Sequence, residues 1–369
     1  MYENLFTSPS VNPEWLSPEV RAQIPVSQFD LIISQYLALL GAYEGAEGTA
    51  PNFRLTFENG YVNSQIVLNA AGQIAGIWFG PPEPKVSGLE DALAGFYELP
   101  GEVSLLVVSN QGILASINPD VPLAVGSAFK MAIAAALKDL VELGVVSWDD
   151  VITLEASDIS LPSGMLQTWP VGTPMTIQSL ATLMISISDN TATDALLRFV
   201  GRERVEMYTT FSKPMLSTRE LFTLKDSANS ELLEAYRQGD VEERRAVLDQ
   251  LKALPLPHVT VLDDGPVAID VEWYFTVGEL ANLIAYIQDL PFMSVNPGVA
   301  NPADWQHVAF KGGSEPGVLN LTTLVVGNSG TTYIISATWN NHQEVLDEAR
   351  FFGLYSGLLS ALKQLDAAE

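Results

Sequence analysis

The 369-residue chain carries 44 acidic and 18 basic side chains, and its net charge of −26 argues against nucleic acid and anionic membrane surfaces as partners. It contains no cysteine, which excludes disulfides, thiolate catalysis and cysteine-ligated zinc. The length, with 47% apolar and 17% charged residues, predicts an ordered protein of about two domains.

The N-terminal region has the pattern of a small α+β domain. Residues 26–43 have the spacing of an amphipathic helix, and residues 51–79 alternate apolar and polar positions as a meander of short strands does. The following segment, GPPEPKVSG at 80–88, holds three prolines and two glycines and predicts a linker. We therefore expect one domain over residues 1–84 and a second over residues 85–369.

The second domain is expected to be of α/β class, with strands from both ends of its sequence in one sheet. A hairpin is predicted over 102–118 and three antiparallel strands over 305–340. Residues 202–270 are polar and charged, and their pattern defines no elements beyond one solvated helix face in GDVEERRAVLDQ. Helices are predicted at 127–144, 176–188, 191–201, 276–290 and 342–364.

Ser127 and Lys130, in AVGSAFKM, stand three residues apart at the start of a predicted helix, so they share a face. Free N–H groups at a helix start favour negative charge, which suits a serine that becomes an alkoxide. Burial lowers the pKa of a lysine, which could then accept the serine proton. Alternatively, Ser127 is only an N-cap and Lys130 extends to water. A second S-x-x-K pair, Ser360 and Lys363, is interpreted as surface.

Two further motifs follow in order. Ser188-Asp189-Asn190 lies between two predicted helices, and Lys311-Gly312-Gly313-Ser314 ends a predicted strand. Each has a structural alternative, the first as a helix cap and the second as a strand end with a turn. S-x-x-K, S-D-N and K-T-G together are typical of class A β-lactamases and penicillin-binding proteins.

From about residue 90 onward the chain resembles these penicillin-recognising serine hydrolases, through AVGSAFKM, LMISISDNTATDALL and FKGGSEPGV. The resemblance implies an antiparallel five-stranded sheet flanked by helices. The whole chain also resembles two-domain serine hydrolases found in clavam biosynthesis clusters, through IAGIWFGPP, SLPSGMLQTWP and STREL. That second resemblance implies that the small α+β domain is NTF2-like or cyclase-like.

The resemblance also implies roles for the motif residues. Ser127 would attack an acyl carbonyl and form an acyl-enzyme, with Lys130 as its proton acceptor. Ser188 would relay a proton toward the leaving group. Asn190 would hold Lys130 and a substrate amide, and Lys311 would attract a substrate carboxylate.

Further residues would line the substrate site. The N–H groups of Ser127 and Ser314, with Gly313 beside them, would form an oxyanion hole. Trp169, in the loop before the second motif, is the best tryptophan candidate for a cleft wall. His307 is interpreted as structural. In the small domain, carboxylates could serve an isomerase-like pocket, although solvated surface positions explain them more simply: Asp30, Glu44 and Glu58.

Two departures from the family pattern bear on activity. The third motif has Gly312 in place of threonine, so the hydroxyl that would bind a carboxylate is missing. The chain also has no E-x-x-L-N segment, whose glutamate activates the deacylating water in class A enzymes, and Glu220 in STREL is the nearest candidate. Slow deacylation of β-lactams follows.

The sequence thus predicts a serine hydrolase for an ester, amide or β-lactam, with weak β-lactam turnover and neither a metal nor an organic cofactor. The alternative is a sensor or binding protein that β-lactams acylate with little turnover. A peptidoglycan peptidase would need export. The N-terminal stretch lacks the pattern of a signal peptide and no apolar run is long enough to span a membrane, so a cytoplasmic location is expected as the sequence stands. The sequence does not indicate the oligomeric state.

Overall fold

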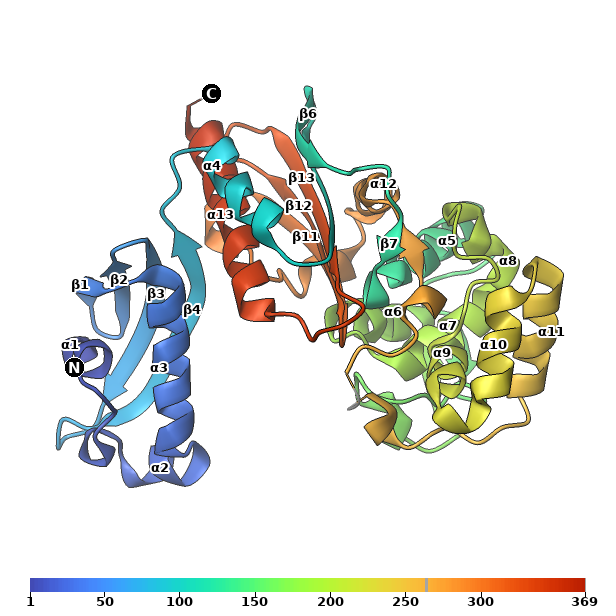
Figure 1. The fold of residues 1–369 in the computed structure, drawn as a ribbon, viewed down its shortest axis with the longest axis horizontal. Coiled ribbons are helices and arrows are strands. Elements are labelled where there is room, and N and C mark those ends of the chain that lie inside the picture. The colour runs from blue at the N-terminus through green and yellow to red at the C-terminus, as the bar shows by residue number, and fades with distance from the viewer. Residues whose placement is uncertain (263–264, 369) are drawn as a thin grey trace. The chain divides into compact units, whose positions relative to one another are not determined.

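The computed structural model describes residues 1–262 and 265–368, which form two compact units (Figure 1). The first contains residues 1–97 and the C-terminal segment from Asp347, and the second contains Glu98–Leu346. Residues 85–97 and the C-terminal segment thus group with the small N-terminal part. The division at 84/85 drawn from the sequence stays a prediction.

The first unit is built on a four-stranded antiparallel meander in the order β1-β2-β3-β4. Phe29 and Ile33 of the third helix are buried in one apolar cluster with Phe57 and Val62 of the strands. The strands are β1 (Tyr43–Thr49), β2 (Asn52–Phe57), β3 (Gly60–Leu68) and β4 (Ile74–Pro84). The helices are α1 (Tyr2–Thr7), α2 (Pro18–Gln23), α3 (Val26–Leu40), α4 (Leu89–Ala94) and α13 (Glu348–Ala367).

The predicted linker is wrong in its first half, because β4 continues through Gly80 to Pro84. Pro82 and Pro84 lie opposite Val62 and Gly60 of β3. β4 is the last strand of its sheet, and an edge strand tolerates prolines, which cannot donate a ladder hydrogen bond. The predicted meander also lacked β1, whose exposed sequence YEGAEGT has no strand-like alternation.

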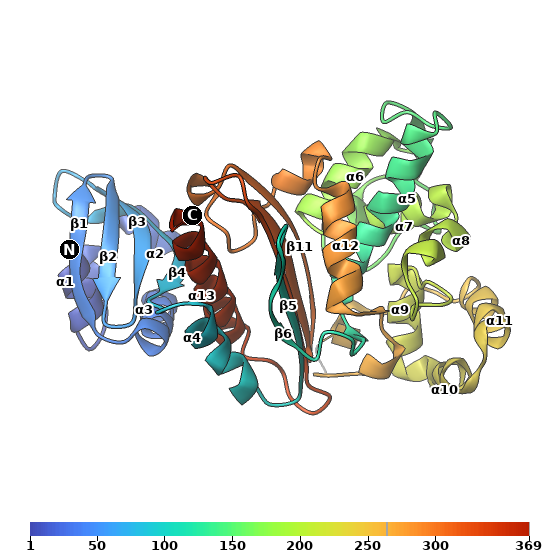
Figure 2. The same cartoon turned by 90° about the horizontal axis from the view of Figure 1, so that it is seen from above.

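The second unit contains the expected five-stranded antiparallel sheet, in the order β11-β12-β13-β5-β6. The predicted hairpin and the three later strands are therefore confirmed, and strands from both ends of the unit meet where β13 pairs with β5. Helix α12 (Val277–Ile287) packs against this sheet (Figure 2). The strands are β5 (Glu102–Ser109), β6 (Gly112–Ile117), β11 (His307–Glu315), β12 (Val318–Val326) and β13 (Thr332–Asn340).

A helical block surrounds α5 (Lys130–Glu142), in which the residues from Lys130 to Leu137 are all buried. A helix that is apolar all round belongs at the centre of a core. The described residues of 202–270, where the sequence defined only one helix face, hold four α-helices and several 3-10 turns. The remaining helices are α6 (Ile177–Ser186), α7 (Asn190–Val200), α8 (Arg202–Val205), α9 (Thr218–Lys225), α10 (Ser230–Gln238) and α11 (Val241–Leu251). Short strand pairs complete the unit: β7 (Leu123–Ala124) with β10 (Tyr274–Phe275), and β8 (Val151–Thr153) with β9 (Pro174–Thr176).

Within the described ranges, no helix has the length and apolarity needed to cross a membrane.

Candidate active site

Ser127 lies in a single 3-10 turn, Gly126–Phe129, and the α-helix begins only at Lys130. The expected helix start at Ser127 is therefore wrong by three residues. Three residues per turn would still place positions i and i+3 on one face. The hydrogen bonds of Lys130 Nζ go to Ser188 and Asn190, so proton transfer from Ser127 to Lys130 stays a prediction. Gly126 has a φ of +50°, a left-handed conformation that glycine adopts without strain and that lets strand β11 approach closely.

Lys130 is completely buried, and three oxygen atoms lie within hydrogen-bond distance of its side-chain nitrogen. Nζ donates to the Ser188 carbonyl oxygen at 2.7 Å, to Ser188 Oγ at 3.0 Å and to Asn190 Oδ1 at 2.6 Å. The structure thus brings the first two motifs together across 58 to 60 residues of sequence. Lys130 does not extend to water, so the surface interpretation of this lysine is excluded.

Ser188 joins all three motifs. Its hydroxyl oxygen accepts from Lys130 Nζ at 3.0 Å and from Lys311 Nζ at 3.1 Å. Because both of these bonds use the oxygen as acceptor, the Ser188 O–H remains free to donate elsewhere. Its backbone has a φ of +57°, which is uncommon for a residue other than glycine and is a form of strain often found at functional sites.

The two lysines share a buried environment that disfavours their charged forms. Burial lowers the pKa of Lys130 well below its usual value, and the charge of Lys311 lowers it further, against weaker opposition from Asp194 and Asp189. Burial also lowers the pKa of Lys311, to about 7. A lysine that is neutral near pH 7 can accept a proton from a serine hydroxyl.

Asn190 is buried, and both ends of its amide are in use. Oδ1 accepts from Lys130, while Nδ2 donates to the Leu161 carbonyl oxygen at 3.0 Å. The predicted contact of Asn190 with Lys130 is present in the structure. The predicted contact of Asn190 with a substrate amide stays a prediction.

The third motif lies directly against the turn that carries Ser127. A Cβ built on Gly313 would stand 2.4 Å from the Ser127 nitrogen and 2.7 Å from the Ala128 nitrogen, so only glycine fits there. A Cβ on Gly126 would stand 3.1 Å from the Ser314 nitrogen. The backbone nitrogens of Ser127 and Ser314 therefore lie on either side of the same close contact, and their role as the two donors of an oxyanion hole stays a prediction.

Gly312 shows why this chain departs from the Lys-Thr-Gly pattern. A Cβ at this position would stand 2.9 Å from the Phe310 ring and 3.1 Å from the Asn320 carbonyl oxygen. A threonine would therefore require both neighbours to move.

Trp169 and Glu220, the remaining candidates in this unit, have different surroundings. Trp169 is 41% exposed and follows a loop that also exposes Met165.

Glu220 is buried, and both of its carboxylate oxygens accept hydrogen bonds from Arg202. One of these oxygens also accepts from the Ser217 N–H. These bonds explain Glu220 as a structural residue of α9.

Sequence reasoning missed two residues behind the motifs, Ser163 and Asp194, and gave no role to Asp189 of the second motif. Ser163 donates to the Ser188 carbonyl oxygen at 2.6 Å, and Asp189 accepts from the same loop. Asp194 is one helical turn after Asn190, and burial raises its pKa to about 7 although the N–H groups of Thr218 and Arg219 oppose that rise. The sequence could have indicated that Asp194 is buried, because it is an acidic residue in the otherwise uncharged segment TATDALL.

No group of three or more His, Asp or Glu side chains in the described parts of the chain is placed to hold a metal ion. His307 bonds through Nε2 to the Gln288 carbonyl oxygen at 3.2 Å.

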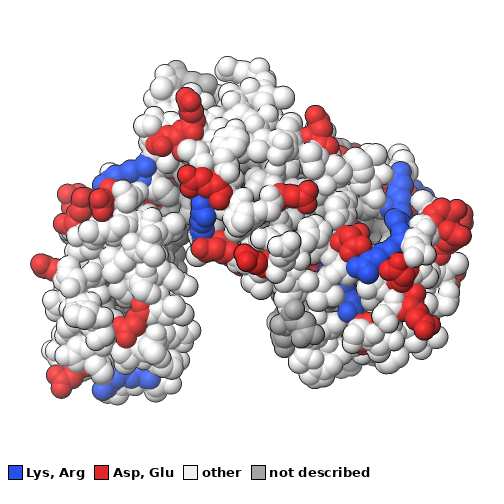
Figure 3. Space-filling model, viewed as in Figure 1, with Lys and Arg blue, Asp and Glu red and all other residues white. Residues whose placement is uncertain are grey.

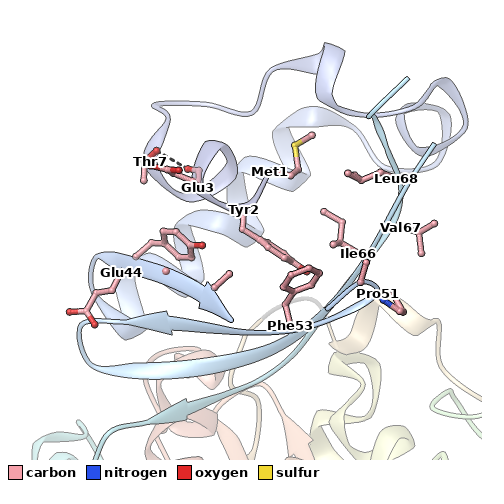
Figure 4. Close-up of a pocket in the computed structure, with 14 residues that line it drawn as sticks. Met1, Tyr2, Glu3, Thr7, Glu44, Pro51, Phe53, Ile66, Val67 and Leu68 are labelled. Carbon is pink, nitrogen blue, oxygen red and sulfur yellow. Dashed lines mark hydrogen bonds between the residues drawn. The ribbon is translucent and has the colours of Figure 1, made fainter. Parts of the chain in front are cut away.

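The first unit has a separate cavity of about 970 Å³, between α1 and strands β1 to β3 (Figure 4). Tyr2, Phe53 and Ile66 form part of its apolar wall, and Glu44 lies on its lining. Of the three carboxylates considered in this domain, Asp30 instead accepts from the Val11 N–H at 2.7 Å and Glu58 from the Ala42 N–H at 3.5 Å.

Comparison with known proteins agrees with this architecture. Residues 89–234 match the model of the Beta-lactamase enzyme family, Beta-lactamase2. A β-lactamase from Sphaerobacter thermophilus DSM 20745 has a similar structure at 20% identity, with a TM-score of 0.52, over 77% of this chain and 98% of that chain. An ancestral class A β-lactamase (GNCA) is similar at 19% identity, with a TM-score of 0.51, over 76% and 99%.

A protein named PBP-A is similar at 17% identity, with a TM-score of 0.51, over 75% of this chain and 95% of that chain. A search among curated proteins found no match. The chain thus has a class A β-lactamase-like fold, and its residues 89–234 match the β-lactamase enzyme family.

Proposed function

We propose that the chain is a serine hydrolase that cleaves an ester, amide or β-lactam through an acyl-enzyme on Ser127. The observation that carries the proposal is the half-buried hydroxyl of Ser188, which lies between two buried lysines of lowered pKa in the same unit as the turn that holds Ser127. The match to the Beta-lactamase enzyme family over the segment with Ser127 and Ser188 supports it.

In the proposed reaction, neutral Lys130 accepts the Ser127 proton while Ser127 Oγ bonds to the substrate carbonyl carbon. The N–H groups of Ser127 and Ser314 bind the oxygen that becomes negative. As the carbonyl re-forms, the bond between its carbon and the leaving oxygen or nitrogen breaks. Ser188 gives its proton to that leaving atom and takes the proton that Lys130 received from Ser127. Water then cleaves the acyl-enzyme and releases the acid.

Acylation is better supported than deacylation. Within residues 1–262 and 265–368, no carboxylate hydrogen-bonds to Ser127, Lys130 or Lys311. Glu220 is held by Arg202 and by its own helix start. A water-activating carboxylate is therefore not assigned, and we expect esters, with their more reactive acyl-enzymes, to turn over better than β-lactams.

The second candidate, a sensor or binding protein that β-lactams acylate without release, is favoured by the same observation on Glu220. The narrower assignment to two-domain hydrolases with an NTF2-like or cyclase-like N-terminal domain is also part of this proposal. The four-stranded meander with α3 across it is compatible with that assignment.

The test compares the native chain with Ser127→Ala on a chromogenic cephalosporin and a p-nitrophenyl ester, with intact mass recorded during turnover. We expect an adduct on the native chain that clears with the ester and persists with the cephalosporin. Ser127→Ala should form neither adduct, because no other residue would supply the nucleophile. Lasting adducts with both substrates would favour the sensor, and product release by Ser127→Ala would disprove the proposed chemistry.

A further inference from the structure

A buried ion triad that the proposed reaction does not use lies beside the candidate active site. Lys225, at the end of α9, contacts the carboxylates of Glu272 and Glu315 at once. The side chains of Lys225 and Glu272 are 3% and 0% exposed, and that of Glu315 is 11% exposed. The Lys225 partners lie 47 and 90 residues away, so the triad connects three distant segments.

One carboxylate of the triad belongs to the strand that carries the third motif. Glu315 directly follows Ser314 and is the last residue of β11. Side chains two apart on a strand point to the same face, so Glu315 lies on the face of Gly313, which packs against the Ser127 turn. The contact with Lys225 therefore holds β11 at the end where Ser314 presents its N–H.

The other carboxylate belongs to the segment that supports the Ser127 turn from behind. Glu272 precedes Trp273, whose carbonyl oxygen accepts from the Val125 N–H at 2.9 Å. The Trp273 ring stacks on Phe129 at 3.9 Å between centroids, and Phe129 directly precedes Lys130. One lysine thus links the two segments on either side of the nucleophile.

The protonation of each carboxylate in the triad depends on its charged neighbours. Burial raises the pKa of Glu272 well above its usual value, Glu315 raises it further, and Lys225 opposes the rise. Glu272 Oε2 and Glu315 Oε1 are buried with no hydrogen-bond partner in the described part of the chain. Burying a charged group with an unpaired oxygen atom costs free energy. Stabilisation of the fold therefore does not by itself explain this triad.

We propose that the Lys225–Glu272–Glu315 triad is a positioning device that fixes the Ser314 N–H against the Ser127 turn and so sets the geometry of the oxyanion hole. The inference rests on the proposed function. Lys225 and Glu315 do not touch the reacting atoms, so they act through β11.

The test is Glu315→Ala, which cuts the connection to β11 but leaves Lys225 paired with Glu272, so no lone charge is buried. Lys138 provides a matched control, because it also pairs with two carboxylates, Asp289 and Glu142. Glu142→Ala likewise removes one carboxylate and leaves the other. Both variants are compared with the native chain in acylation by a p-nitrophenyl ester and in affinity for phenylboronic acid, whose tetrahedral serine adduct depends on the oxyanion hole.

We expect Glu315→Ala to lower kcat about ten- to hundredfold, since a displaced donor costs less than a removed one. KM should change little, because the lost interaction is made only with tetrahedral species and not with bound substrate. For the same reason, affinity for the boronic acid should fall by about the same factor as kcat. Glu142→Ala should stay within about twofold of the native rate, as expected for a surface ion pair.

Native-like acylation by Glu315→Ala would overturn the inference, and so would a raised KM with kcat unchanged. If Glu315→Ala does not fold, Glu315→Gln retains the shape and should show a smaller loss with the same split between kcat and KM. A native chain that forms no adduct with any probe would instead refute the proposed function itself.

Discussion

At the residue scale, Lys311 is the residue that we predict attracts a substrate carboxylate. Its Nζ donates to Ser188 Oγ and to the Gly312 carbonyl oxygen at 2.6 Å, and burial lowers its pKa to about 7. The adjacent Gly312 adds no hydroxyl. Attraction of an anionic substrate therefore depends on a charge that is half lost near neutral pH.

This dependence predicts a pH effect on substrate preference. As pH rises from 6 to 8, the charged fraction of Lys311 falls from about 0.9 to about 0.1 for a pKa of about 7. The ratio of kcat/KM for a carboxylate-bearing cephalosporin to that for a neutral ester should therefore fall up to about tenfold. Both substrates require neutral Lys130, so its titration cancels in the ratio. Parallel pH profiles measure it.

Lys311→Met is the control for this prediction, because it removes the charge at every pH. The ratio should then be low and independent of pH. A native ratio that stays constant or rises between pH 6 and 8 would show that Lys311 does not recognise the carboxylate.

At the scale of elements, Asp189 joins the start of helix α7 to the loop at Met165 and Leu166, which precedes β9 and α6 in the sequence. Oδ1 accepts from the Ala192 N–H at 2.9 Å, and Oδ2 accepts from the N–H groups of Met165 at 2.6 Å and Leu166 at 2.9 Å. A Cβ on Gly164 would stand 2.3 Å from the Asp189 carboxylate, so the loop must be glycine there. One buried carboxylate thus orders the loop that leads to Trp169.

Asp189→Asn should therefore destabilise the fold by about 2–3 kcal/mol, because an amide N–H₂ would face backbone donors and leave them unpaired. Urea unfolding measures the loss, and hydrogen exchange at the Met165 and Leu166 amides should become faster. Asp226→Asn is the control, since Asp226 is an N-cap that accepts from a single exposed N–H and asparagine caps equally well. Equal stability of the two variants would contradict this role for Asp189.

Prediction from sequence succeeded where the apolar residues of an element recur with the spacing of a helix or a strand. This is the case for α6, α12 and the strands β11 to β13. It failed for β1, because YEGAEGT forms a strand through its pairing with β2 and not through its own propensity. It also failed for α9, whose polar residues are buried because they pair with polar groups of other elements, as Thr218 does with Asp194 of α7.

The candidate site divides in the same way. Ser127 and Lys130 could be placed on one face from their spacing alone, since three residues span one turn. Ser188 and Lys311 are 123 residues apart, and only the known association of their motifs brought them together. No periodicity connects Lys225 with Glu272 and Glu315, so the triad could be found only in the fold.

At the scale of the whole molecule, the charge is unevenly distributed. Ten of the 18 basic residues lie between Arg198 and Lys252, and many of them pair with acids, as Arg202 does with Glu220 and Arg245 with Glu206. Figure 3 shows acidic side chains over the visible face of both units, with fewer basic side chains among them on each unit. Most of the excess negative charge therefore faces water without a cation.

This excess predicts a stability that rises with ionic strength. Uncompensated like charges repel in the folded state, and raising NaCl from about 10 mM to about 150 mM shortens the screening length from about 30 Å to about 8 Å. We expect Tm to increase by a few degrees, because buried pairs such as Lys225 with Glu272 are screened far less than the surface repulsion. KCl at equal concentration should give the same shift, which separates screening from binding of a particular cation. A Tm that falls with added salt would mean that attraction between surface ion pairs outweighs the repulsion of 26 net charges.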